Sequence, residues 1–249
     1  LGTEADNRTR DAQENNQKLD EIVNVGRFQL DEVDNEIYLI DQKRVTVYDA
    51  STGDFKRGWG GHGMPLSEIS NEPIPSYEWT GEPPPEEEQF APTLHFIEIS
   101  NDRRVYVGER GQNRIQVFTT EGEWLQDIYV SPNTPAQRGG CAGLRETSAS
   151  PMPVGTFYSS ICGSMYKMII SKDPEQKYLF VADAHNDVVW EVERESGETL
   201  GYFGGNGRLA GQFHFANAIG IDTFGNVFVG EVDTAKRIQK FAPVPTGVR

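Results

Sequence analysis

The sequence has few of the residues on which active-site chemistry most often depends. Its 249 residues include only two cysteines and four histidines. It has no Gly-x-Ser-x-Gly elbow, no P-loop and no Cys-x-x-Cys pair, which are signatures of a hydrolase nucleophile, a phosphate-binding loop and a redox or zinc site. No apolar run approaches the roughly 18 residues that cross a bilayer, so we expect no transmembrane segment.

Basic residues are also scarce relative to acidic ones. Lys and Arg total 23 against 38 Asp and Glu, which gives a formal net charge of −15 at pH 7. A surface of this sign repels a phosphate backbone, so nucleic acid is not an expected partner. The acidity suits a periplasmic or secreted protein, and that is the localisation we predict.

The two cysteines, Cys141 and Cys162, lie in one irregular stretch rich in Gly, Ser and Pro. A disulfide between them would pin this loop, contribute about 3 kcal/mol in the chain-entropy model and imply an oxidising compartment. The alternative is two unrelated thiols, one or both of them buried. The sequence leaves both interpretations open.

The chain divides into a polar start and a turn-rich remainder. Residues 1–20 have no strand pattern and fit a linker, or a segment that follows a removed signal peptide. Gly (26 residues) and Pro (14 residues) are frequent, as expected where many short strands need many turns. We therefore place the folded part at residues 21–249.

The strongest signal in the chain is an internal repeat. Four segments share an aliphatic or aromatic strand that ends in an acid, then a short turn, then a second alternating strand. They are Ile37–Asp41 with Arg44–Tyr48, Val105–Glu109 with Arg114–Phe118, Leu179–Asp183 with Val188–Val192, and Val227–Glu231 with Arg237–Phe241. Alternation with period 2, together with β-branched and aromatic residues, predicts strands.

Sequence on either side extends each pair to a four-stranded unit. A further strand leads to glycines after the pair, as in Phe55–Gly61 and Thr199–Gly205. Leu94–Ser100 and Ala218–Asp222 supply a strand before it. Four antiparallel strands per repeat form the blade of a β-propeller, so the predicted fold class is all-β with four-stranded blades.

The repeat also carries a family resemblance. The stretch from Thr199 to Phe241 resembles an NHL repeat nearly end to end, with the fragments GQF, IGID, GNVFVGE and RIQKF in order, and Asn101–Phe118 is a second good match. The resemblance implies an NHL propeller, a type that usually has six blades. Four are recognisable here. Either N-terminal blades are missing, which we favour, or degenerate blades lie in the insertions; a four-blade ring is a further alternative.

Two insertions interrupt the blades, at residues 62–90 and 131–165. The first holds six prolines and a dense acidic patch, so it cannot pair as a central strand. The second contains both cysteines. Long irregular loops in compact domains are usually functional or mobile. We expect specificity to lie in these loops, unless they seal an edge or a neighbouring subunit.

An acid recurs at the end of the first strand of each pair, and an arginine follows it in three of the four repeats. The acids are Asp41, Glu109, Asp183 and Glu231, and the arginines are Arg44, Arg114 and Arg237. Because the same position is acidic in every repeat, we interpret these residues as a structural ion pair or turn cap. A metal or acid–base site would not be expected four times.

His95 is the histidine that the pattern favours, since it opens an inner strand (Thr93–Ile99) near a propeller's central channel. The arrangement resembles the peptidyl-hydroxyglycine amidating lyases, NHL propellers whose inner-strand histidines hold zinc, which implies that His95 is a metal ligand. The matching positions elsewhere are Asn217 and a place near Lys167, and His214 lies three residues early. None of these completes a three-histidine zinc site. His95 therefore fits a metal ligand, a channel-lining polar group or a structural histidine.

These observations leave more than one function open. The first is an extracytoplasmic binding or assembly module that recognises a protein or a small-molecule ligand through its loops and channel. The alternative is a metal-dependent propeller enzyme, amidating-lyase-like or lactonase-like, with zinc or calcium in the channel. A purely structural subunit of a larger assembly is the third.

Overall fold

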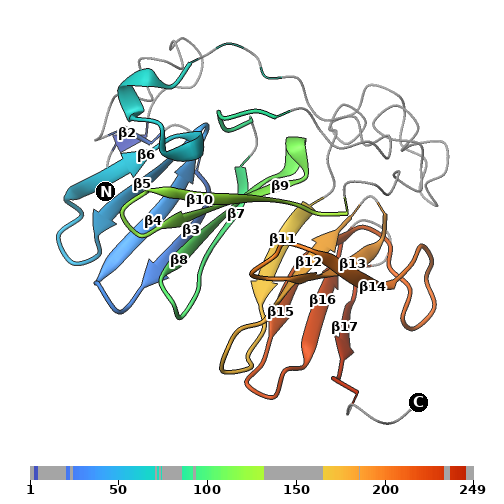
Figure 1. Cartoon of the computed structure of the whole chain (residues 1–249). Helices are drawn as coiled ribbons and strands as arrows, with labels where there is room; N and C mark the ends of the chain where they lie inside the picture. Colours follow the sequence, from blue (N-terminus) through green and yellow to red (C-terminus); the bar gives the residue numbers. More distant parts are fainter. Residues whose placement is uncertain are drawn as a thin grey trace. The chain divides into compact units, whose positions relative to one another are not determined.

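The computed structural model of the chain is all-β (Figure 1) and describes residues 3–4, 21–22, 25–70, 72, 74, 86–91, 94–131, 165–184, 186–232 and 236–244. The chain forms two compact units, residues 1–77 with 85–128 and residues 78–84 with 129–249. The helices of the described part are three 3₁₀ turns: η1 (Gly61–Gly63), η2 (Leu66–Glu68) and η3 (Arg110–Gln112). None of its helices is long and apolar enough to cross a membrane.

The first unit holds two four-stranded antiparallel sheets, coloured blue to green in Figure 1. The first blade has the strand order β3-β4-β5-β6 and the second has β7-β8-β9-β10. The strands are β3 (Val25–Asp31), β4 (Glu36–Asp41), β5 (Arg44–Asp49), β6 (Phe55–Trp59), β7 (Leu94–Ile99), β8 (Arg104–Glu109), β9 (Arg114–Thr119) and β10 (Trp124–Tyr129). A short parallel pair, β1 (Thr3–Glu4) with β2 (Glu21–Ile22), precedes them.

The second unit repeats this arrangement and is coloured yellow to red in Figure 1. The third blade has the order β11-β12-β13-β14, and the fourth has β15-β16-β17, with three strands among the described residues. The strands are β11 (Met165–Ile170), β12 (Tyr178–Asp183), β13 (Val188–Glu193), β14 (Thr199–Gly204), β15 (Ala216–Ile221), β16 (Val227–Glu231) and β17 (Ile238–Phe241). Sheets of this order, repeated along the chain, are the blades of a β-propeller.

In the first unit the core lies between the two blades, because alternate side chains of a strand point to opposite faces of its sheet. Tyr38 and Ile40 of the first blade meet Ile97 and Val107 of the second in one buried cluster. Trp59, at the end of β6, belongs to the same cluster. Burial of each such side chain contributes about 1.5–3 kcal/mol, so this contact holds the two blades together.

The second unit has an equivalent core between the third and fourth blades. Ala182 and Val189 of the third blade form one buried cluster with Ile219 and Val229 of the fourth. Phe213, from the segment between the two blades, is fully buried in it. The same alternation of side chains therefore produces the same packing in both units.

The structure confirms the fold class predicted from the repeat, and two boundaries differ from the prediction. Met165, which the sequence placed in the second insertion, is the first residue of β11. Phe90, placed in the first insertion, lies in the core with its ring centroid 5.9 Å from that of Phe118. The proline-rich and acidic residues before Phe90 led the sequence analysis to include Phe90 in the insertion. Its burial in the core stabilises the fold more than an exposed phenylalanine would.

Candidate functional site

In the second blade the recurring acid and arginine form a buried ion pair. Arg114 donates from Nε to Glu109 Oε1 (2.7 Å) and from Nη2 to Oε2 (3.0 Å), and both side chains are fully buried. Gln116 Nε2 donates to Glu109 Oε1 (3.0 Å), and the Ala91 amide donates to Oε2 (2.7 Å). Burial raises the pKa of Glu109, and the Arg114 charge opposes this shift. Arg114 also donates to the Gln89 carbonyl (2.9 Å), which ties the segment before β7 to the sheet.

The fourth blade repeats this network with residues of its own repeat. Arg237 Nε and Gln239 Nε2 both donate to Glu231 Oε1, at 2.6 and 2.8 Å. The His214 amide donates to Glu231 Oε2 (2.7 Å), and Arg237 donates to the Gln212 carbonyl (2.6 Å). His214 is therefore positioned by its backbone, at the place that Ala91 takes in the second blade.

The acids of the other two blades are also engaged within their own blades. Asp41 accepts a hydrogen bond from Arg44 Nη2 (2.9 Å), and both side chains are buried. No arginine follows Asp183, which instead accepts from Asn186 Nδ2 (2.7 Å) and Trp190 Nε1 (2.9 Å). These bonds satisfy acids that burial would otherwise destabilise, and each fastens the turn at a strand end.

The inner strand of every blade has a bulge at the same place, directly after the residue that pairs with the recurring acid. The bulged residues are Gly26 in β3, His95 in β7, Tyr166 in β11 and Asn217 in β15. The sequence placed the third of these positions near Lys167, but Lys167 pairs with Ala182 and Tyr166 is the bulged residue. A bulge changes the direction of the side chain at the bulged residue. The residue type at this position can therefore differ between blades while the pairing of the surrounding strands stays the same.

His95 is half-buried, and its Nε2 lies 3.4 Å from Arg110 Nη1 of η3. A guanidinium at this distance repels a divalent cation, so the surroundings of His95 within its own unit do not favour metal binding. Among the described residues, His95 belongs to no group of three or more potential ligands. Lys167 and Asn217 are half-buried like His95, and His214 is buried.

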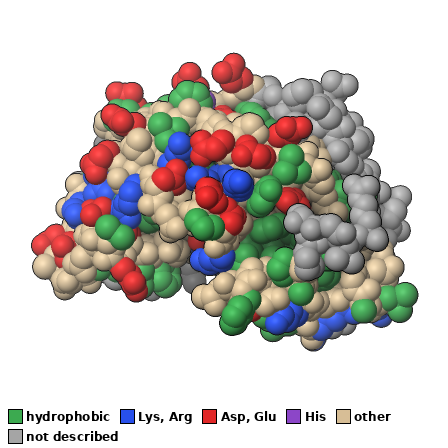
Figure 2. Space-filling model, turned by 60° about the horizontal axis from the view of Figure 1, so that its bottom comes forward, with side chains coloured by type: hydrophobic (Ala, Val, Ile, Leu, Met, Phe, Trp, Pro, Cys, Tyr) green, Lys and Arg blue, Asp and Glu red, His purple; other side chains and the backbone are tan. Residues whose placement is uncertain are grey.

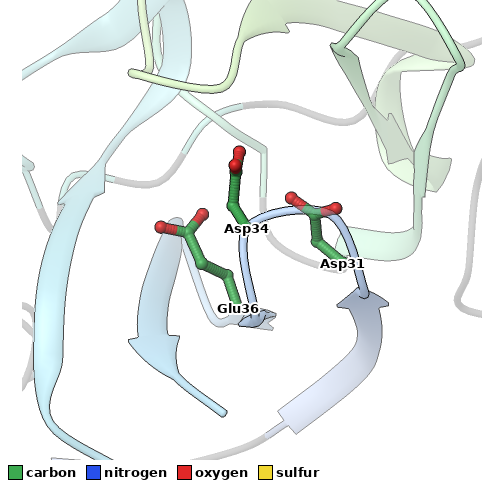
Figure 3. A group of neighbouring side chains, drawn as sticks. All are labelled: Asp31, Asp34 and Glu36. Atoms are coloured by element: carbon green, nitrogen blue, oxygen red, sulfur yellow. The ribbon is translucent and has the colours of Figure 1, made fainter.

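One group of three carboxylates is close enough to hold a cation, at the turn between β3 and β4 (Figure 3). Asp31, Asp34 and Glu36 each offer an oxygen within 4.8 Å of the other two. Arg103 donates to both Asp31 and Asp34. Arg57 donates to both oxygens of Glu36, at 2.8 and 2.6 Å. Lys56 also pairs with Glu36, so two arginines and one lysine balance the three carboxylates, and the group is an ion-pair network. Figure 2 shows Asp and Glu beside Lys and Arg over the face that it draws.

Acidification is expected to weaken the first blade through Glu36. Its hydrogen bonds with Arg57, supported by Lys56 and Tyr38, lower the pKa of Glu36 from 4.5 to about 2. The folded state therefore binds this proton less readily than the unfolded state. The resulting stabilisation, up to about 3 kcal/mol, is present above about pH 4.5 and is lost as the pH falls towards 2. Urea unfolding across this range measures it. A Glu36→Gln variant with an equally steep decline would contradict this origin.

A further polar site lies in the first unit, where η1 contacts β10. His62 Nε2 is 3.0 Å from Asp127 Oδ2, and its ring stacks on Trp124 with centroids 4.3 Å apart. Trp124 Nε1 donates to Asp127 Oδ1 (2.9 Å), and Arg114 Nη1 donates to Asp127 Oδ2 (3.1 Å). We call His62, Trp124 and Asp127 the Trp124 site.

His62 has a backbone conformation that glycine adopts more easily. His62 has φ 49° and ψ 28°, in the left-handed region, which costs a residue with a Cβ roughly 1–2 kcal/mol. Its amide donates to Gln116 Oε1 (2.8 Å). In the fourth blade, Gln239 is the equivalent glutamine, and its Oε1 accepts a hydrogen bond from the Gly211 amide (2.9 Å). Gly211 has φ 81°. Since a glycine meets the backbone requirement without strain, what the histidine adds is its imidazole.

The Trp124 site combines a fixed geometry with exposure. Trp124 is 42% exposed, although its indole N–H donates a hydrogen bond and its ring is stacked on His62. His62 is 16% and Asp127 11% exposed. The sequence did not predict that these three side chains come together, because His62 and Asp127 are 65 residues apart. The only local signals were a histidine in a run of glycines and a Trp and an Asp three residues apart on one strand.

The two cysteines lie outside the described residues. Cys141 and Cys162 belong to the stretch 132–164, so the disulfide between them stays a prediction. Residues 75–85 of the first insertion, which include four of its six prolines and part of its acidic patch, also lie outside the described part. The specificity expected of the two insertions therefore remains a prediction as well.

Comparison with known proteins gives a likeness of fold at low sequence identity. No protein-family model and no curated protein matches the chain. Among solved structures it is similar to hydrazine synthase of Kuenenia stuttgartiensis, with TM-score 0.48, 10% identity and coverage of 88% of this chain and 49% of that one. It is also similar to an inactive virginiamycin B lyase of Staphylococcus aureus with quinupristin, with TM-score 0.47, 13% identity and coverage of 89% and 56%. The chain spans about half the length of these proteins.

Proposed function

We propose that this β-propeller chain is an NHL-type binding or assembly module, periplasmic or secreted, which recognises a protein or small-molecule ligand at the Trp124 site. The observation that carries the proposal is that Trp124 is fixed by a hydrogen bond from its indole N–H to Asp127 and by stacking on His62, and is still 42% exposed. Tryptophan is the side chain most often found to dominate binding energy at protein interfaces. The Trp124 site is thus the best-formed recognition surface among the described residues.

The fixed geometry favours binding for an entropic reason. A partner that orders a flexible side chain loses about 0.5–1.5 kcal/mol of free energy for each one. Trp124 is already fixed by Asp127, and Asp127 is fixed by Arg114 from inside the blade. The chain of bonds from Glu109 through Arg114 to Asp127 therefore supports the exposed indole from the core. Preorganisation of this kind leaves more of the contact energy for affinity.

The surroundings of the other candidates favour a binding module over a metal enzyme. The four recurring acids accept hydrogen bonds from their own blades. The carboxylate group at the β3–β4 turn is paired with two arginines and Lys56, and Arg110 lies next to His95. A cation would meet positive charge at each of the last two places, and its binding would be weakened there.

The test compares ligand capture by matched variants of one strand. Trp124→Ala is expected to reduce the amount of a specifically retained ligand about 10- to 100-fold, which corresponds to the loss of roughly 1.4–2.8 kcal/mol of binding energy. Leu125→Ala is the control, because Leu125 is the next residue and is 44% exposed. The immobilised native protein, each variant and a blank resin are compared by quantitative mass spectrometry. Equal retention by the native protein and Trp124→Ala would exclude the Trp124 site as the binding surface.

A further inference from the structure

Two carboxylates of the second blade share one arginine. Arg114 donates to Glu109 Oε1 (2.7 Å) and to Asp127 Oδ2 (3.1 Å). Within the part of the chain that the structure describes, it is the one Lys or Arg side chain that pairs with either acid. The Glu109 side chain is fully buried and that of Asp127 is 11% exposed. One guanidinium therefore balances two carboxylates, and one negative charge is left in excess when His62 is neutral.

The excess negative charge lies next to the Trp124 ring. Asp127 Oδ1 accepts the hydrogen bond of the indole N–H (2.9 Å). A donor that is bonded to a carboxylate is polarised, so electron density shifts towards the rest of its ring. The faces of an aromatic ring are already negative because of its quadrupole. Both effects favour a positive charge over the face of Trp124.

One face of Trp124 is open to such a charge. The imidazole of His62 stacks on the other face, with the ring centroids 4.3 Å apart and the planes at 30°. Trp124 is nevertheless 42% exposed, so the exposed area belongs to the opposite face and the ring edge. No Lys or Arg of the described residues lies over this ring. A cation on this face would therefore come from a ligand.

The first blade contains the same combination of groups with its cation in place. Tyr38 donates from its hydroxyl to Glu36 Oε2 (2.9 Å). The Arg57 guanidinium lies 5.6 Å from the centre of the Tyr38 ring and pairs with the same carboxylate. An aromatic side chain that is bonded to a carboxylate thus takes a guanidinium in this chain. At the Trp124 site the described residues supply the ring and the carboxylate, and they place no guanidinium over the ring.

The surroundings of the Trp124 site favour a cationic partner over a neutral one. Glu123 is exposed and directly precedes Trp124. Glu121, in the turn before β10, is 73% exposed and lies 3.7 Å from Arg57 Nε. The whole chain has a formal net charge of −15. Charges of this sign raise the local concentration of a basic partner before contact, and a protein segment with several basic residues gains most from this attraction.

We propose that the Trp124 site binds an arginine side chain of a basic protein segment, with the guanidinium stacked on the exposed face of the indole. The contact rests on the proposed function of this site and specifies the chemistry of its ligand. Arginine is favoured over lysine because its planar guanidinium stacks on aromatic faces and is more weakly hydrated. Leu125 does not take part in the contact, since neighbouring residues of a strand project to opposite faces of the sheet.

Two synthetic peptides test the requirement for a positive charge. The probe is acetyl-Gly-Arg-Gly-Arg-Gly-amide, and its control has citrulline, a neutral isostere, in place of both arginines. The indole N–H signal of Trp124, assigned from its loss in Trp124→Phe, is followed by NMR at neutral pH and roughly 0.15 M salt. We expect the arginine peptide to shift this signal saturably and to bind at least about 10-fold more tightly than the citrulline peptide.

Matched variants separate the Trp124 ring from the general negative charge. Calorimetry with the arginine peptide is expected to show about 5- to 30-fold weaker binding by Trp124→Ala and an unchanged affinity of Leu125→Ala. Both variants keep the net charge of the native protein, so long-range attraction alone would affect them equally. Asp127→Asn keeps an oxygen for the indole N–H and removes the excess charge, so it is expected to weaken binding about 10-fold. Circular dichroism checks that every variant is folded.

Failure of the arginine contact and failure of the binding function give different results. Equal affinity for the two peptides, or equal affinity of Trp124→Ala and Leu125→Ala for the arginine peptide, would overturn the arginine contact. If a ligand is still retained through Trp124 in the capture experiment, the binding function stands and only the arginine contact is wrong. If neither ligand capture nor peptide binding depends on Trp124, both proposals fail.

Discussion

Replacing Arg114 by methionine is expected to lower the free energy of unfolding by about 3–5 kcal/mol, because it leaves the Glu109 carboxylate buried without its counter-charge. Arg114 makes two hydrogen bonds to Glu109 and a third to Asp127, and it also binds the Gln89 carbonyl. The guanidinium is fully buried, so water cannot replace these bonds. Urea unfolding at pH 7, followed by tryptophan fluorescence and by circular dichroism, measures the loss.

The fourth blade provides a matched control for the Arg114 experiment. Arg237 makes the same pair with Glu231, whose side chain is also fully buried, but the Arg237 side chain is 28% exposed. Water can therefore reach the place that the guanidinium leaves, and Arg237→Met is expected to cost less than Arg114→Met, about 1–3 kcal/mol. In the double variant Glu109→Gln/Arg114→Met the buried charge is gone, and about half of the lost stability should return. If Arg114→Met and Arg237→Met lowered the free energy of unfolding by equally small amounts, the buried pair of Arg114 and Glu109 would not stabilise the second blade as proposed.

Gly108→Ala is expected to destabilise the second blade by about 2–3 kcal/mol through overpacking. A Cβ at Gly108 would lie 2.1 Å from the ring of Phe96, its partner on the neighbouring strand. Phe96 is fully buried, so its ring has no open space into which it can move. Thermal and urea unfolding of the variant measure the effect, and no change in stability would show that the ring relocates without cost.

The equivalent position of the fourth blade separates this clash from any general effect of glycine. Gly230 pairs with Ala218, and a Cβ there would have its closest contact at 3.3 Å, with the Ala218 Cβ. Gly230→Ala is therefore expected to change the stability by less than about 1 kcal/mol. Combining Gly108→Ala with Phe96→Leu should cost less than the sum of the two single changes, because the smaller side chain makes room for the new methyl group.

The sequence predicted the blades because their physics is local. Alternating residues in Ile37–Asp41 and Val227–Glu231 form strands at the predicted places, within one residue at each end. Alternation of apolar and polar residues with period 2 identifies a strand with one buried face, and it can be recognised without knowing which element packs against that face. The recurring acids were also visible, because the same turn repeats in each blade and needs the same partner. Their hydrogen bonds with Arg44, Arg114 and Arg237 involve residues only three to six positions away.

The chemistry of the candidate sites was decided by contacts between distant parts of the chain. The sequence pointed to His95, but only the fold places Arg110 beside it and puts Tyr166, in place of Lys167, at the bulge of the third blade. The imidazole of His62 meets Asp127 across 65 residues. The sequence by itself determined the all-β blades, through alternation and turns. The tertiary structure alone decided which polar side chains are paired and which aromatic side chain stays exposed, because both depend on packing between strands that no local pattern specifies.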